Sequence, residues 1–199
     1  PLARCACHGW QLDCCPTRVQ GVVDAGAARL GMHGAKGGGG VIAGLIDHTL
    51  LKADATAAEV EALCKEAAQH HFATVCVNPA WVGLAARHLR GTGVGVCSVV
   101  GFPLGATTPD VKAYETRRAI VDGATEIDIV ISRALVLTGN WRGLFDEMKA
   151  YREACGEAHV KAILATGELG TLSNVAKASW VCMQAGADFI KTSTGKEAV

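Results

Sequence analysis

The sequence predicts an α/β fold built on a parallel sheet, and two observations favour it. From Val41 onward, short apolar runs alternate with longer segments whose apolar residues recur at helical spacing. The short runs are continuously apolar, as expected for parallel strands that are covered on both faces. Repeated strand–helix units fit either a doubly wound sheet or a (β/α)8 barrel, and the pattern alone does not choose between them.

Six apolar runs are the expected strands, whereas a complete barrel of this kind needs eight. Each is short enough for a strand and is followed by a segment of helical period. The expected strands are Leu45–Leu51, Thr74–Val77, Val94–Phe102, Glu126–Ser132, His159–Ala165 and Phe189–Thr194.

The segments between the strands carry helix start signals. These include a capping box, a proline at a first helical position and polar residues that can cap. The capping box opens a helix whose apolar stripe is Val60, Leu63, Cys64 and Ala67. The expected helices are one opened by Thr56–Glu59, Pro79–Leu89, one opened by Thr108 and Pro109, Trp141–Ala154 capped by Asn140, and one opened by Thr171 or Ser173.

Residues 1–40 differ in texture from residues 41–199, and we expect a flexible Cys/Gly-rich segment ahead of a single domain. The run Gly34–Gly40 is typical of flexible linkers. The cysteines of this segment could be imagined as metal ligands, but their spacing matches no closed zinc pattern. An unstructured tail without a metal is therefore favoured over a metal site for Cys5, Cys7, His8, Cys14 and Cys15.

Composition excludes several classes of protein. The chain has 199 residues, half of them hydrophobic, with 19 basic and 19 acidic side chains. Zero net charge and few aromatic residues argue against a nucleic-acid module, and zero net charge also argues against a membrane-surface protein. Apolar stretches such as Val94–Val100 are far shorter than the ~20 residues of a membrane helix. Nine scattered cysteines without a secretory signal indicate reduced thiols and a cytoplasmic protein. The ends, Pro1 and Val199, read as those of a fragment.

Four charged residues interrupt the apolar strands: Asp47, Asp128, Lys161 and Lys191. Charged side chains are rarely buried unless they are paired. Each one alone would be read as lying at a strand end and reaching water. Four charged residues on separate strands instead favour a shared active-site pocket, because inward positions near the carboxyl ends of barrel strands converge on one pocket.

Lysine and aspartate in such a pocket point to imine chemistry. An ordinary lysine has a pKa near 10.4, so only about one in 2,500 is neutral at pH 7. Burial or a neighbouring cation lowers that pKa and makes the neutral amine more abundant. A neutral amine attacks a carbonyl, and the protonated imine that forms withdraws electrons from the adjacent carbon–carbon bond. A carboxylate such as Asp128 can then move protons.

The end of the sequence predicts an anion site. Gly195 lets backbone N–H groups approach a phosphate, and Lys196 supplies positive charge. A P-loop is excluded because Ile190 stands where its first glycine is needed and Glu197 stands where Ser or Thr is needed.

Five motifs together resemble the deoxyribose-phosphate aldolase family, and they occur in the family's order over about Val41 to Val199. Any one of them would be weak evidence, but the ordered set is specific. They are Leu45-Ile46-Asp47-His48-Thr49-Leu50-Leu51, Thr74-Val75-Cys76-Val77-Asn78-Pro79, Gly101-Phe102-Pro103-Leu104-Gly105, Glu126-Ile127-Asp128-Ile129-Val130 and Asp188-Phe189-Ile190-Lys191-Thr192-Ser193-Thr194-Gly195.

The resemblance implies a (β/α)8 barrel, here with about six of its eight units, and a Schiff-base lyase without metal or cofactor. The family cleaves 2-deoxyribose 5-phosphate reversibly to glyceraldehyde 3-phosphate and acetaldehyde. Lys191 matches the family's Schiff-base lysine and Asp128 its proton-relay aspartate. The matching pocket-lining residues are Asp47, Cys76 and Lys161. The matching phosphate-binding residues are Thr194, Gly195 and Lys196.

The resemblance also implies something that these 199 residues lack. Family members continue with two more strand–helix units, and the first of these carries a second catalytic lysine. We therefore expect low activity, a basic Lys191, and a chain that aggregates or forms a homo-oligomer to cover exposed strand edges. A non-catalytic truncated product and a transaldolase-like Schiff-base barrel are the alternatives. The expected partner is a small phosphorylated sugar, with neither nucleic acid nor membrane.

Overall fold

The computed structural model describes residues 42–197 and contains a sheet of six parallel strands. The strands are β1 (Asp47–Leu50), β2 (Thr74–Val77), β3 (Gly95–Val100), β4 (Glu126–Val130), β5 (His159–Ile163) and β6 (Phe189–Lys191). They lie in the sheet in chain order, each hydrogen-bonded to the next. A doubly wound sheet reverses its strand order, whereas a barrel does not. The expectation of six units of a (β/α)8 barrel is therefore confirmed.

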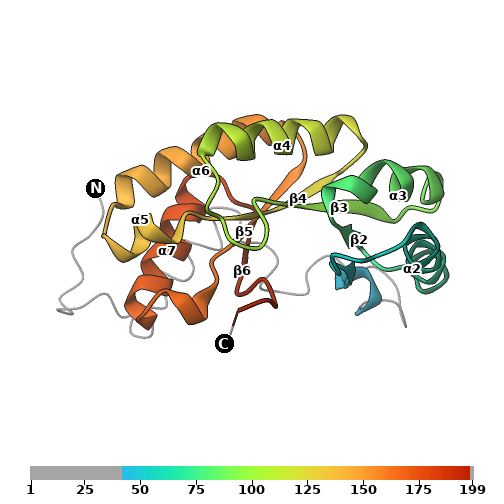
Figure 1. The fold of residues 1–199 in the computed structure, drawn as a ribbon, viewed down its shortest axis with the longest axis horizontal. Helices are drawn as coiled ribbons and strands as arrows, with labels where there is room; N and C mark the ends of the chain where they lie inside the picture. Colours follow the sequence, from blue (N-terminus) through green and yellow to red (C-terminus); the bar gives the residue numbers. More distant parts are fainter. Residues whose placement is uncertain (1–41, 198–199) are drawn as a thin grey trace. The chain divides into compact units, whose positions relative to one another are not determined.

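Each of the expected helices is present (Figure 1). The α-helices are α2 (Ala57–His70), α3 (Val82–His88), α4 (Pro109–Val121), α5 (Arg133–Leu137), α6 (Trp141–Cys155) and α7 (Leu172–Gln184). Short 3-10 turns are η2 (Ala43–Leu45), η3 (Pro79–Trp81) and η4 (Thr166–Glu168). Helix α5 was not predicted, and η3 and α3 were predicted as one helix, because a single helical turn carries too few residues to show a period.

Side-chain caps fix where the helices start. The Thr56 hydroxyl accepts a hydrogen bond from the Glu59 N–H, and the Glu59 carboxylate accepts one from the Thr56 N–H, which completes the predicted capping box. Asn140 caps α6 as predicted. Thr171 rather than Ser173 caps α7, since its hydroxyl accepts a hydrogen bond from a backbone N–H in the first turn.

The main core lies between the sheet and the helices. Ile127 and Ile129 of β4 are fully buried there, together with Leu144, Met148 and Tyr151 of α6. Helices α4 and α6 pack against each other beside this core (Figure 1). Burying each large apolar side chain contributes roughly 1.5–3 kcal/mol, so the helix-facing side of the sheet supplies most of the apolar stabilisation.

The other face of the sheet has a different composition. Its apolar part is a small cluster of Cys76, Cys97 and Val99, against which Leu51 and Phe102 pack. Successive residues of a strand point to opposite faces, so residues flanking the large core residues project onto this inner face. The predicted charged residues lie there.

All five cysteines of residues 42–197 are buried free thiols. Within the same range, no helix has the length and apolar character needed to cross a membrane. The predictions made for residues 1–40, including the tail cysteines and the Gly34–Gly40 linker, lie outside the described residues.

Candidate active site

Four side chains from separate strands meet on the inner face of the sheet. The Lys161 Nζ lies 3.0 Å from Asp47 Oδ2 and 3.2 Å from Asp128 Oδ1. The Lys191 Nζ lies 2.5 Å from Asp128 Oδ2. The expectation that Asp47, Asp128, Lys161 and Lys191 form one cluster is therefore confirmed, while their catalytic roles stay predictions.

Strand alternation explains the convergence. On β4, Asp128 stands between Ile127 and Ile129, which face the helices and are fully buried in the main core. Ile190, next to Lys191 on β6, also packs against that core. Asp128 pairs in register with Lys161, which brings their side chains to the same level of the sheet. On β4, the hydrophobic residues on each side of Asp128 therefore determine which way its carboxylate points.

Two members of the cluster were missed in the sequence reading. Glu126 forms an ion pair with Lys161, and its other oxygen lies 3.3 Å from His159 Nδ1. The Cys97 Sγ lies 3.7 Å from Lys161 Nζ. Glu126 precedes Asp128 by two residues and so shares its face, a signal that strand alternation offered. Cys97 could be placed only from the pairing of β2 with β3, where it lies beside Cys76.

The charges of the cluster stabilise one another. Burial alone would raise the pKa of Asp128, but Lys161 and Lys191 outweigh it and lower the pKa of that carboxyl. Burial alone would lower the pKa of Lys191, but the adjacent Asp128 carboxylate raises it. Lys161 follows the same rule, its pKa raised by nearby Cys97, Asp128 and Asp47 against the effect of burial. At neutral pH the resting cluster therefore holds two ammonium groups and an ionised Asp128.

Cys76, which was predicted to line the pocket, lies beside the charged cluster. Its side chain is fully buried, and its Sγ lies 4.0 Å from Asp128 Oδ2. Its neighbour Cys97 is also fully buried, and burial raises the pKa of that thiol well above the ordinary value. The floor of the candidate site therefore consists of two adjacent sulfur atoms beneath the charged groups.

The predicted phosphate-binding turn follows β6. Thr194 is buried, whereas Gly195 and Lys196 are exposed, and Gly195 has a φ of +72° that favours glycine. The Thr194 N–H donates to the Glu197 carboxylate at 2.9 Å. The Thr194 hydroxyl also donates to this carboxylate, and the hydrogen bonds from Thr194 outweigh the effect of burial and lower the pKa of Glu197. The backbone of this turn therefore already binds one anion, the Glu197 carboxylate of the same chain.

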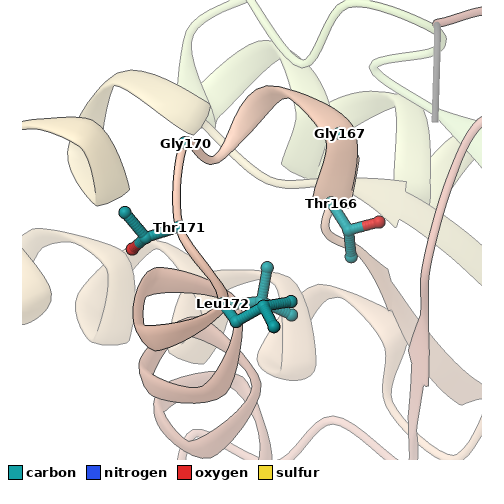
Figure 2. A pocket seen from close by; sticks show the side chains of 6 residues that line it. Thr166, Gly167, Gly170, Thr171 and Leu172 are labelled. Carbon is teal, nitrogen blue, oxygen red and sulfur yellow. The ribbon is translucent and has the colours of Figure 1, made fainter.

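A surface pocket lies apart from the charged cluster, between η4 and the start of α7 (Figure 2). Its lining residues are Thr166, Gly167, Gly170, Thr171, Leu172 and Val175. None of them belongs to the cluster, but the Thr166 N–H donates to the Thr192 carbonyl, one residue beyond Lys191. The pocket therefore borders the strand end that carries the candidate lysine.

Comparison with known proteins agrees with this geometry. Residues 41–199 match the profile described as DeoC/LacD family aldolase. The chain belongs to this family. Human deoxyribose-phosphate aldolase is 50% identical over 173 residues, which cover 77% of this chain and 54% of the human protein. The enzyme of the same name from Streptococcus gordonii is 53% identical over 150 residues, which cover 75% of this chain and 68% of that protein.

Solved structures of aldolases share the fold. A crystal structure from Coccidioides immitis is 39% identical with a TM-score of 0.77, covering 79% of this chain and 62% of that one. The tetrameric deoxyribose phosphate aldolase from Aeropyrum pernix is 30% identical with a TM-score of 0.71, covering 90% of this chain and 73% of that one. The chain thus spans about half the length of the human relative and up to about three quarters of these structures.

This DeoC/LacD member has a second buried charge cluster, which the sequence reading also missed. Lys112 of α4 is fully buried, and its Nζ donates to the Val130 carbonyl at 3.0 Å and to Ser132 Oγ at 3.1 Å. The same nitrogen lies 3.3 Å from Glu147 Oε1 of α6. Burial lowers the pKa of Lys112 despite the opposing effect of Glu147. These contacts connect the end of β4, two residues after Asp128, to helices α4 and α6.

Proposed function

We propose that the chain carries the aldolase chemistry of its relatives, through a Schiff base on Lys191. The reaction is the reversible cleavage of 2-deoxyribose 5-phosphate to glyceraldehyde 3-phosphate and acetaldehyde. The observation that carries the proposal is the 2.5 Å contact between Lys191 Nζ and Asp128 Oδ2, which pairs a primary amine with a proton acceptor. The names of the relatives at 50–53% identity support the choice of substrate.

The reaction begins with proton transfer. Asp128 accepts a proton from the Lys191 ammonium, and the neutral amine adds to the C1 aldehyde of the open-chain sugar. Asp128 returns this proton to the hydroxyl of the adduct, water leaves and a protonated imine forms. Because the imine draws electrons, the bond between C2 and C3 breaks as Asp128 takes the proton of the C3 hydroxyl. Glyceraldehyde 3-phosphate departs. The remaining enamine takes this proton back from Asp128 at C2, and water hydrolyses the protonated imine to release acetaldehyde and the Lys191 ammonium.

Lys161 is a positioning residue in this proposal. Its ammonium contacts Asp47, Glu126 and Asp128 at once and holds three carboxylates on one face of the sheet. Without it, like charges so close together would repel, and the pKa of Asp128 would rise. The ionised form of Asp128, which the first proton transfer requires, therefore depends on Lys161.

The phosphate of the substrate is proposed to bind at the turn after β6. The Thr194 N–H already donates to a carboxylate, and the Lys196 backbone N–H donates to the Thr194 hydroxyl at 3.0 Å. A phosphate would take the place of the Glu197 carboxylate and receive the charge of the exposed Lys196. The turn begins directly after the strand that carries Lys191, so both ends of one sugar phosphate could be held.

Assembly and location are further parts of the proposal. The Aeropyrum pernix relative is a tetramer, which supports a homo-oligomer here. The cysteines of residues 42–197 are free thiols, which supports a reducing compartment such as the cytoplasm.

Borohydride trapping tests the proposal. The chain is incubated with acetaldehyde and reduced, the adduct is mapped by mass spectrometry, and acetaldehyde release from 2-deoxyribose 5-phosphate is measured in parallel. We expect the label on Lys191, and loss of both signals in Lys191→Ala but not in the matched variant of the exposed Lys149. A label mainly on Lys161 or Lys196 would contradict the assignment. Absence of label and of turnover would support a non-catalytic chain.

A further inference from the structure

We propose that Cys76, Cys97 and Asp128 form a binding site for a thiophilic divalent cation such as Zn²⁺ or Cd²⁺, and that an ion bound there blocks Lys191. Each ligand comes from a different strand, β2, β3 and β4, and all three side chains are fully buried. Their ligand atoms lie within 4.8 Å of one another. The binding half of this inference is independent of the proposed function, whereas the blocking half rests on it.

The spacing of the three ligand atoms is close to that of a metal site. With metal–sulfur bonds of about 2.3 Å and tetrahedral angles, two ligand atoms of a zinc ion lie roughly 3.5–3.8 Å apart. Cys76 Sγ and Asp128 Oδ2 are 4.0 Å apart, and the whole set is within 4.8 Å. Changes of about 1 Å in side-chain position would close the site, while the register of the strands stays as it is. Water would complete the coordination.

Buried cysteines commonly serve as small apolar residues, and three others in the described chain do so. Cys64, Cys155 and Cys182 lie in the helix-facing core. Cys76 and Cys97 differ because they are partners in the pairing of β2 with β3 and face the charged cluster. Two thiols side by side with a carboxylate supply the soft ligands that select zinc and related ions.

The balance of charge permits binding. The cluster contains three carboxylates, Asp47, Glu126 and Asp128, and two ammonium groups. When a divalent cation binds, two S–H bonds break, two metal–sulfur bonds form and the two protons go to solvent. The sum of charges is therefore unchanged. The Lys161 ammonium, 3.7 Å from Cys97 Sγ, would donate to the new thiolate.

A bound ion would block Lys191 because the ion and the lysine need the same oxygen atom of Asp128. Asp128 Oδ2 accepts the hydrogen bond of Lys191 and also lies 4.0 Å from Cys76 Sγ. A metal bound to that oxygen would displace the Lys191 ammonium and remove its proton acceptor. The side chain of Lys191 is 32% exposed, so an ion can reach the buried ligands by moving that side chain aside.

Direct metal binding tests the first half. The parent is the full chain with Cys5, Cys7, Cys14 and Cys15 replaced by serine, so that these thiols cannot contribute. Cd²⁺ is titrated while calorimetry and the ultraviolet cadmium–thiolate band are recorded. We expect one ion per chain, and affinity at least about tenfold weaker in Cys76→Ser and in Cys97→Ser. The matched variant Cys64→Ser should bind like the parent. Absence of the band in the parent, or an undiminished band in both test variants, would overturn the inference.

X-ray absorption of the Cd²⁺-loaded parent requires no site variant and therefore holds even if the serine substitutions unfold the chain. Two sulfur neighbours together with oxygen neighbours would support the site; a shell of oxygen and nitrogen alone, or of four sulfurs, would overturn it.

The second half is read from acetaldehyde release from 2-deoxyribose 5-phosphate, with and without Cd²⁺. We expect release to fall as the site fills, because the proton acceptor of Lys191 is taken, and to return with a chelator. Equal release from the loaded chain would overturn the blocking. If the chain releases no acetaldehyde even without metal, the proposed function fails, and the binding half is judged by the titration alone.

Discussion

Replacing Asp128 by asparagine should make Lys191 easier to deprotonate. Burial lowers the pKa of this lysine, and the carboxylate 2.5 Å away raises it. The substitution keeps the shape of the side chain but removes the anion, so burial is then opposed only by the smaller raising effects of Cys76 and Cys97. An opposite charge at this distance commonly shifts a pKa by roughly one to three units. At a fixed pH below its pKa, the neutral fraction of Lys191 should therefore rise by roughly ten- to a thousandfold.

The assay separates amine chemistry from turnover. The rate of borohydride trapping with acetaldehyde is measured against pH, and the label on Lys191 is quantified by mass spectrometry. In Asp128→Asn the midpoint of trapping should move to lower pH. Turnover of 2-deoxyribose 5-phosphate should fall, because the proton acceptor is gone. A midpoint that stays in place or moves to higher pH would refute the electrostatic account of Lys191.

Glu126→Gln is the matched control. It removes the same charge from the same face of β4, but Glu126 contacts Lys161 rather than Lys191. We expect a smaller shift of the trapping midpoint than in Asp128→Asn. Equal shifts in the two variants would mean that the total charge of the cluster matters and the short contact does not.

Two further expectations concern stability. Lys112→Ala should lower the free energy of unfolding in urea by about 3–5 kcal/mol, because it leaves the Glu147 carboxylate buried without its cation. The double variant Lys112→Met/Glu147→Leu removes both charges and should be more stable than Lys112→Ala; if it is not, that explanation fails. Gly105→Ala should cost at least about 2 kcal/mol, since its φ is +63° and an added Cβ would lie 2.3 Å from the Ile131 carbonyl oxygen. Gly91→Ala has a similar φ of +80° but open space, so an equal loss there would rule out the clash.

The sequence predicted the strands and the direction of their charged residues well, for a simple reason. Two neighbours of opposite polarity on a buried strand must point to opposite faces, and the apolar one must face the core. Ile127, Asp128 and Ile129 illustrate this rule. The strand ends were less accurate. Residues Val94–Phe102 were predicted as one strand, yet β3 ends at Val100, because Gly101 adopts a φ of +61° and turns the chain.

The sequence could not predict contacts that depend on how distant segments are placed. Lys112 and Glu147 lie 35 residues apart on separate helices, and each alone resembles an ordinary exposed helix residue. Their burial follows from the packing of α4 against α6. The adjacency of Cys76 and Cys97 likewise depends on the register of β2 and β3, which one sequence does not fix.

The two faces of the sheet carry different kinds of side chain, and this division determines what an amino-acid substitution on each face affects. On β4, the side chains that pack towards the helices alternate with those that form ion pairs on the other face of the sheet. A substitution at Ile129 would alter the packing of the helix-facing core, and one at Asp128 would alter the charged cluster. The two side chains point to opposite faces of the sheet, so each substitution removes contacts on its own face. The stability of the fold and the reactivity of the charged cluster can therefore be selected, or engineered, in separate rounds of mutation on the same strand.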